Sequence, residues 1–250
     1  MDPRWDLSGV PGTENTVYYQ LGNAVWKRDV FDDISIPSTI IHIFPSLLVA
    51  EDHQAQSRFA DIRGYKTSTE IGILDLKTGQ TYTACTGVAC RTYYDVSQNG
   101  TWFVNYNQAG GNQADFYRVS DLKQGITTPF RATNLGIGHS GWAWDKDGNE
   151  VFTFQGADDM FSAYNPENGV KIDMISYSEI GYFGGGIHLK RFDNPAMKGW
   201  AFFSTYSDTN TMWSQNQLFM IEIKDRISTP KPRIWRLGST NVRPYPPGTN

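Results

Sequence analysis

Two histidines in glycine-flanked segments are the side chains of this sequence best suited to chemistry. His139 lies in the segment Gly138-His139-Ser140-Gly141, and His188 lies in the segment Gly185-Gly186-Ile187-His188. Imidazole is a common metal ligand and general base, so two histidines that share one site could bind a divalent cation. A histidine pair lacks the third and fourth ligands that a metal site usually needs. The structural alternative therefore stays open, in which each imidazole hydrogen-bonds a neighbouring backbone carbonyl.

Basic and aromatic side chains accompany these histidines. Lys190 and Arg191 could pair with an acidic sugar, although strand alternation would place them on opposite faces, so at most one points inward. Trp142 and Tyr182 could stack on sugar rings. In a chain with eight tryptophans, however, most indole rings are expected to pack in the core. We expect Trp142, Tyr182 and Lys190 to bind ligand.

The two cysteines, Cys85 and Cys90, are five residues apart around a turn that contains Gly87. This spacing could bring their β-carbons to bridging distance on a short loop, so we predict a disulfide. The alternative is a pair of half-buried thiols. A Cys-x-x-Cys redox or zinc pair is excluded by the spacing.

A repeated two-part pattern supplies the elements that would position these residues. One part is a strand, a turn with Asp and Gly, and a second strand; the other is a strand that ends in a polar turn. Asp95 and Asp145 occupy equivalent turns 50 residues apart. Two hairpins per repeat make four strands, which is the size of a propeller blade.

The pattern predicts an all-β fold, a β-propeller of four-stranded antiparallel blades in one domain that spans residues 1–250. The alternative is a β-sandwich, but sandwiches do not usually repeat one pattern at a fixed interval. The expected blades and the C-terminal loop are residues 1–38, 39–91, 92–137, 138–178, 179–238 and 239–250.

Composition agrees with this class and limits the partners. Charged residues make up 19% and aromatic residues 14%, a balance that favours strands and turns over helices. The net charge is −4 and no basic run is present, so nucleic acid is not an expected partner. The longest apolar stretches are far shorter than the roughly 20 residues that cross a bilayer, so no membrane span is expected.

Three segments resemble a known family. Pro3-Arg4-Trp5-Asp6, the segment from Gly138 to Asp145, and the segment from Gly185 to Arg191 are similar to secreted bacterial seven-bladed β-propellers related to oligogalacturonate lyases and TolB-like or WD40-like repeats. In the lyase-like relatives, histidines at the channel mouth bind a divalent cation that neutralises a uronate carboxylate, and a basic side chain removes the C5 proton.

The resemblance therefore implies His139, His188 and Arg191 as catalytic residues. It also implies His139 and His188 as ligands of a cation such as calcium or manganese. Because the lyase metal cluster cannot be matched residue for residue, the first hypothesis is a binding or scaffold module that presents a channel mouth to a glycan or an extracellular protein. The alternative hypothesis is a uronate polysaccharide lyase.

Length and localisation complete these expectations. Five repeats fall short of the seven blades of the resembling family, so we expect missing blades or a second chain to complete the ring. A disulfide predicts a secreted or periplasmic protein, although the segment that begins at Met1 has no basic and apolar regions of a signal peptide.

Overall fold

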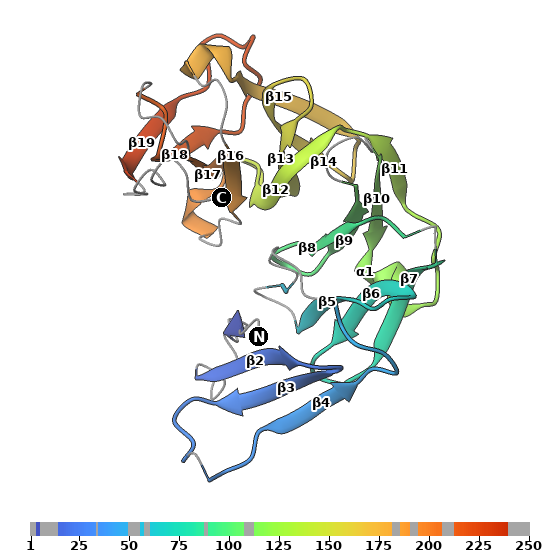
Figure 1. Cartoon of the computed structure of the whole chain (residues 1–250). Coiled ribbons are helices and arrows are strands. Elements are labelled where there is room, and N and C mark those ends of the chain that lie inside the picture. Colours follow the sequence, from blue (N-terminus) through green and yellow to red (C-terminus); the bar gives the residue numbers. More distant parts are fainter. Residues whose placement is uncertain are drawn as a thin grey trace, which may run out of the picture. The chain divides into compact units, whose positions relative to one another are not determined.

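Antiparallel β-sheets account for nearly all the regular structure in the computed structural model of the chain (Figure 1), and the predicted all-β, propeller-type class is confirmed. The structure describes residues 4–5, 15–33, 35–49, 56–57, 61–87, 90–107, 113–181, 186–190, 195–206 and 213–239. In these ranges no helix has the length and hydropathy to cross a bilayer.

Five sheets follow one another along the chain. The strands of the first sheet are β1 (Arg4–Trp5), β2 (Thr16–Leu21), β3 (Ala24–Asp29) and β4 (Thr39–Ile43). Those of the second are β5 (Ile62–Lys66), β6 (Glu70–Asp75) and β7 (Thr81–Thr86). Those of the third are β8 (Tyr93–Val96), β9 (Trp102–Tyr106), β10 (Gln113–Arg118) and β11 (Arg131–Asn134). Those of the fourth are β12 (Ile137–Trp144), β13 (Glu150–Gly156), β14 (Met160–Asn165) and β15 (Val170–Ser176). Those of the fifth are β16 (Gly186–Lys190), β17 (Trp200–Tyr206), β18 (Gln217–Glu222) and β19 (Ile234–Ser239).

The helical segments are short and lie between strands. They are the α-helix α1 (Val119–Lys123) and the 3₁₀ helices η2 (Ser178–Ile180) and η3 (Pro195–Met197). α1 connects β10 to β11 and buries Val119 and Leu122 on one side.

The two predicted turns form and explain where the strands end, but the two aspartates are not equivalent: Asp145 lies in its turn, whereas Asp95 lies inside β8 and Ser97 takes the corresponding turn position. Gly100 and Gly148 have φ of 66° and 88°, a backbone region that favours glycine, in the hairpins β8–β9 and β12–β13. Asp145 fixes the second of these turns, because its Oδ1 accepts the N–H groups of Asp147 and Asn149, each at 2.9 Å. The turn residues of the repeated pattern therefore set the hairpins locally.

The first two sheets differ from the predicted blades. Residues 39–43 were expected to open the second blade, but β4 pairs with β3 and completes the first sheet. The second sheet has three strands instead of four. Beside it, Gln56 forms an isolated antiparallel bridge with Arg63 of β5, next to a segment that lies outside the described residues.

The chain divides into two units by its internal contacts, and each is described by itself. The first unit contains residues 1–107 and 114–133, which include the first three sheets. The second contains residues 108–113 and 134–250, which include the fourth and fifth sheets.

In the first unit, the first and second sheets pack through a small apolar cluster. Tyr18, Val25 and Phe44 meet Tyr65 and Leu74 of the second sheet, and all five are buried. A polar contact joins the same two sheets. His42 Nδ1 lies 2.8 Å from the carbonyl oxygen of Gly79, and the imidazole packs edge-on against Phe44.

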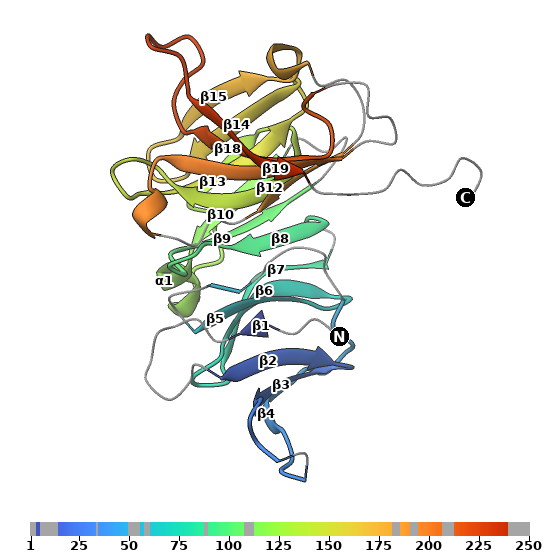
Figure 2. The same cartoon turned by 90° about the vertical axis from the view of Figure 1, so that its left-hand side faces the viewer.

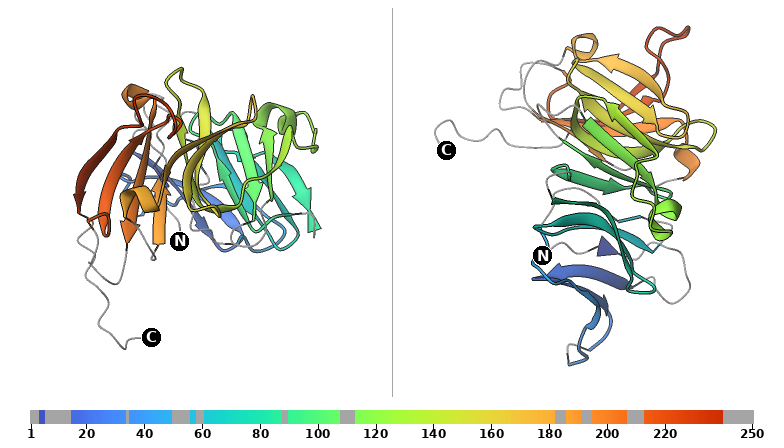
Figure 3. Two further views of the ribbon diagram at one scale, coloured as in Figure 1. Left: turned by 90° about the horizontal axis from the view of Figure 1, so that it is seen from above. Right: turned by 90° about the vertical axis from the view of Figure 1, so that its right-hand side faces the viewer.

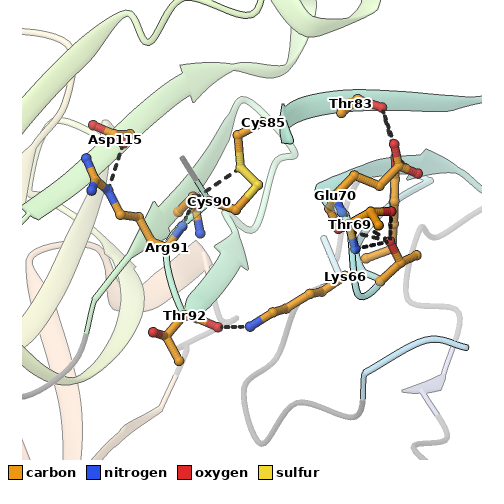
Figure 4. The surroundings of a disulfide bond; sticks show 12 residues. Lys66, Thr69, Glu70, Thr83, Cys85, Cys90, Arg91, Thr92 and Asp115 are labelled. Atoms are coloured by element: carbon orange, nitrogen blue, oxygen red, sulfur yellow. Dashed lines mark hydrogen bonds and ion pairs between the residues drawn. A yellow bond between two sulfur atoms is a disulfide. The ribbon is translucent and has the colours of Figure 1, made fainter. Parts of the chain in front are cut away.

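The second and third sheets of this unit are joined by a larger cluster that includes Ile73, Phe103 and α1. The predicted disulfide between Cys85 and Cys90 is present (Figure 4). The two Cα atoms are 5.4 Å apart, and the two cysteines pack against this cluster.

The loop after the disulfide reaches the third sheet through polar contacts. Arg91 donates its N–H to Asn105 Oδ1 at 2.8 Å and pairs with Asp115 at 3.1 Å. Lys66 of β5 donates to the carbonyl of Thr92 (Figure 4). The disulfide therefore holds a loop whose contacts extend from the second sheet to the third.

In the second unit, the fourth and fifth sheets pack face to face (Figure 3). The centre of the cluster is aromatic, with Phe161 and Phe203 at a ring-centroid distance of 4.3 Å and Phe203 and Phe219 at 5.1 Å. All three rings are fully buried. The apolar residues of alternate strand positions thus supply one continuous core between these sheets.

Candidate functional site

His139 lies near the start of β12, an edge strand of the fourth sheet. The register between β12 and β13 shifts between Ile137 and Ser140, so His139 falls in an irregular part of the ladder. Its side chain is half-buried. A β-carbon at Gly138 would lie 3.2 Å from the Gln155 side chain, so a larger residue there would require that side chain to shift. A bulge of this kind changes the direction in which a side chain points.

His188 lies in β16, the border strand of the fifth sheet, opposite Ser204 of β17. β12 and β16 are neighbours within the second unit, so the two predicted histidines belong to adjacent strands. Lys190 is also in β16, opposite Phe202. The side chains of residues 186–190 are not described, and Tyr182 and Arg191 lie outside the described residues.

Trp142 lies in β12 and is fully buried. Its ring packs edge-on against Phe152 at a centroid distance of 5.1 Å. In this arrangement the indole contributes to packing within the fourth sheet and offers no exposed ring face.

Metal binding was predicted at His139 and His188. Among the described residues, no group of three or more histidine, cysteine, aspartate or glutamate side chains lies close enough to hold a metal ion. The described residues therefore give no metal cluster through which a reaction step could be assigned.

A second candidate site is the outer face of the first sheet, opposite the face that packs on the second sheet. Five side chains from three strands form it: Tyr19, Leu21, Trp26, Ile40 and Ile43. The strand register places Tyr19 beside Trp26 and Trp26 beside Ile40. The rings of Tyr19 and Trp26 stack at 6.5 Å with an interplanar angle of 8°. We call these five side chains the β4 face.

A β-bulge in β4 brings the two isoleucines to this face. Ile43 pairs with Ala24, and Ile40 pairs with Trp26, with a register shift in between. Without the extra residue, positions 40 and 43 would lie on opposite faces of the strand. Leu21 is 55% exposed and Ile43 is 59% exposed. The bulge therefore creates an apolar surface that the described residues leave largely exposed.

Exposed large apolar side chains also concentrate in this part of the chain. Of the fifteen among the described residues, eight fall between residues 21 and 49: Leu21, Val30, Phe31, Ile36, Ile40, Ile43, Leu47 and Val49. Single exposed apolar residues are ordinary on a protein surface, whereas a group of them marks an interaction site.

The connection between β3 and β4 adds negative charge next to the β4 face. Asp32 and Asp33 are exposed there. The backbone N–H of Ser35 donates to Asp33 Oδ1 at 2.8 Å, and this bond lowers the pKa of that carboxyl group. Arg28 lies close to this carboxylate, since its Nη2 donates to the Asp33 carbonyl oxygen at 3.1 Å, and its positive charge also lowers the pKa of Asp33. Asp33 is therefore ionised at neutral pH.

Sequence reasoning did not find the β4 face. The sequence feature that indicates this face is the apolar segment Thr39–Ile43, which has no charged residue. The predicted blade boundaries placed this segment in the second blade. Because a one-residue shift exchanges the two faces of a strand, the bulge could not be placed from the sequence.

Comparison with known proteins identifies the type of fold. The sequence matches no family model and no curated protein. Three solved structures are similar: an oligogalacturonate lyase in complex with manganese (10% identity, TM-score 0.56, 92% of this chain and 63% of that chain); Chaetomium thermophilum Sqt1 (14%, 0.56, 91% and 59%); and Kluyvelomyces marxianus Hsv2 (9%, 0.51, 90% and 62%).

These neighbours have WD40-type or other propeller-type folds, so the sheets of this chain are of the propeller type. The chain spans less than two thirds of the length of each. At identities of 9–14%, the likeness extends to the fold alone.

Proposed function

We propose that this chain is a non-catalytic binding module whose first sheet engages a protein partner. The observation that carries the proposal is the β4 face, an apolar surface on a sheet whose opposite face is already packed. Burying an exposed leucine or isoleucine side chain against a partner stabilises a complex by about 1.5–3 kcal/mol before the costs of association. A surface with several such residues suits a protein better than a glycan, which presents mainly hydroxyl groups.

The experiment compares which proteins of the source organism bind to the purified wild-type chain and to each of two variants. In the first, Leu21→Asp is combined with Ile43→Asp on the β4 face. The control, Ile227→Asp, alters a residue that is 82% exposed in the second unit. A protein from the source organism that binds through this surface should be retained by the wild type and the control and lost by the double variant.

Titration of the captured and purified partner then measures the affinity directly. We expect the double variant to weaken binding at least about tenfold, because central apolar contacts dominate interface energies. Equal affinity of all three proteins would refute a role for the first sheet.

A second candidate function, a lyase-like reaction on uronate polymers, is favoured by the adjacency of β12 and β16, the strands of His139 and His188. The chain is incubated with polygalacturonate, with and without calcium or manganese, and unsaturated product is followed by absorbance. Product that His139→Ala, His188→Ala or Arg191→Ala abolishes would replace the binding-only proposal. Binding of the polymer without product would identify a glycan as the partner instead.

An extracellular setting also belongs to this proposal. The Cys85–Cys90 disulfide supports it, because disulfides persist in oxidising compartments. We also propose that further blades or a second chain extend the set of sheets. The mass of the native protein tests this proposal.

A further inference from the structure

The outermost strand of the first sheet differs from the other outer strands. β4 contains three isoleucines and neither a charged residue nor a proline. By contrast, β11 and β19 contain arginine and β15 contains lysine and aspartate. β7 also lacks charged residues, but it has no exposed large apolar side chain among those described, and the disulfide at Cys85 restrains it. Charges and prolines protect a sheet edge from added strands, and β4 has none.

The backbone of β4 is paired on one side. Its ladder partner is β3, and β4 ends the sheet order (Figure 2). Among the described residues, no strand pairs with its other edge. Outward N–H and C=O groups of an edge strand are best satisfied by another extended backbone. The edge therefore specifies the conformation of its occupant.

We propose that β4 accepts an extended segment of a protein partner as a fifth strand of the first sheet. This inference rests on the proposed function and names the mode of binding. The added strand would lie beside Ile40 and Ile43, so it needs apolar residues on the side of the β4 face. It would extend the apolar rows Tyr19–Trp26–Ile40 and Leu21–Ala24–Ile43 across one more strand.

Charge distinguishes a partner segment from a second copy of this chain. At the end where β4 begins, Asp29, Asp32 and Asp33 outnumber Lys27 and Arg28, so a strand that binds there gains from a lysine or arginine at that end. In an antiparallel pair of two β4 strands, residues 44–49 of the copy would lie at this end, and they contain no basic residue. In a parallel pair, acidic residues would face acidic residues. The occupant is thus an apolar extended segment with a basic end.

The test uses synthetic peptides of alternating valine and threonine with a fluorescent label. Two lysines stand at the C-terminus of one peptide, for an antiparallel strand, and at the N-terminus of the other, for a parallel strand. A matched peptide with N-methyl groups throughout the valine-threonine part keeps the side chains and loses the backbone donors.

We expect saturable binding of one lysine peptide and a loss of at least about tenfold in affinity for its N-methylated form. Ile40→Lys and Ile43→Lys should weaken binding similarly, because an edge lysine opposes strand addition. Val170→Lys, at an exposed position of β15, should leave the affinity within about twofold. Hydrogen exchange should slow at residues 39–43 and stay unchanged in β15.

The inference is overturned if no peptide binds, if the N-methylated form binds as tightly, or if the wild type is a dimer that Ile43→Lys dissociates. The last result would make a second copy the occupant. A partner whose capture depends on Leu21 and Ile43 while residues 39–43 gain no protection would leave the proposed function standing and remove only strand addition. If substitutions in the β4 face do not change how much partner is captured, the proposed function itself is refuted.

Discussion

The interface between the first and second sheets and the interface between the fourth and fifth sheets are built differently. The first has six buried apolar residues among those described, together with the contact of His42 to Gly79. The second has thirteen, centred on three phenylalanines. Among the described residues, the same strand pattern thus produces a first sheet that packs through a small apolar cluster and a pair of later sheets that packs through a larger, continuous core.

The difference suggests where the chain opens most easily. Regions with few buried apolar contacts open at lower free energy than core strands. The first sheet also carries the β4 face, so a partner that binds there would stabilise the more weakly packed of these two regions through mass action. The proposed interaction and the low local stability would then have one cause, which is an apolar face that the described residues do not cover.

The largest effect should come from the core of the second unit. Phe203→Ala removes a fully buried ring between Phe161 and Phe219, and we expect the free energy of unfolding to fall by about 3–5 kcal/mol. Urea denaturation measures it. The control Phe31→Ala, at a residue that is 79% exposed, should change stability by less than about 0.5 kcal/mol. Similar losses in both variants would contradict the assignment of the core.

The disulfide should have the next effect, confined to the first unit. Replacing Cys85 and Cys90 by serine opens a short loop, and the chain-entropy argument gives a loss of about 2 kcal/mol. Hydrogen exchange should accelerate in β6 and β7 and remain slow in β13 and β14. Equal acceleration in both units would show that they open together and would remove the contrast between them.

A smaller effect is expected at the interface of the first sheet. His42→Ala removes the contact with the Gly79 carbonyl and the edge-on packing against Phe44, together worth about 1–2 kcal/mol. Exchange in β2 to β4 should accelerate most. The matched variant Ile40→Ala, on the opposite face, should leave exchange at this interface unchanged. If His42→Ala acts no more strongly than Ile40→Ala, the interface is stronger than its few contacts indicate.

The smallest effect depends on pH and lies in the second unit. The hydrogen bond from Arg226, at 3.1 Å, followed by the N–H of Ser176, lowers the pKa of Glu179 from 4.5 to about 2. This links η2 to the β18–β19 connection. Because the folded pKa is the lower one, the stabilisation is complete above the unfolded pKa of 4.5 and is lost as the pH falls toward 2.

Glu179→Gln should therefore lower stability by at most about 1 kcal/mol at pH 7, since the pair is partly exposed. The difference from the wild type should shrink between pH 4.5 and 2. Urea denaturation across this range measures both. A difference that stays constant with pH would show that the carboxylate charge contributes nothing.

Much of the fold was predictable because its signals are local. Asn99-Gly100 and Asp147-Gly148 place hairpins through backbone conformations that glycine adopts without strain, and both hairpins form. The Cys85–Cys90 spacing likewise predicts a short disulfide loop. The boundary at residue 38 was wrong for strand β4, because its assignment depends on pairing with β3, which is not a local property.

The candidate sites were less predictable for the same reason. The histidine pair was chosen from its glycine-rich setting, and the adjacency of β12 and β16 follows from sheet packing within the second unit. Trp142 was expected to meet a ligand, but the structure gives it a fully buried position against Phe152. Residue type alone does not say which face of a strand a neighbouring sheet covers.

The sequence by itself thus determined the all-β class, the turns and the disulfide, since each depends on residues close together in the chain. Only the tertiary structure decided which apolar faces are buried and which stay exposed. The alternation of side chains is the same in the first sheet and the fourth. Whether a second sheet lies against each face is decided by pairing and packing between distant segments, and a single bulge in β4 is enough to place Ile40 and Ile43 together on the exposed side.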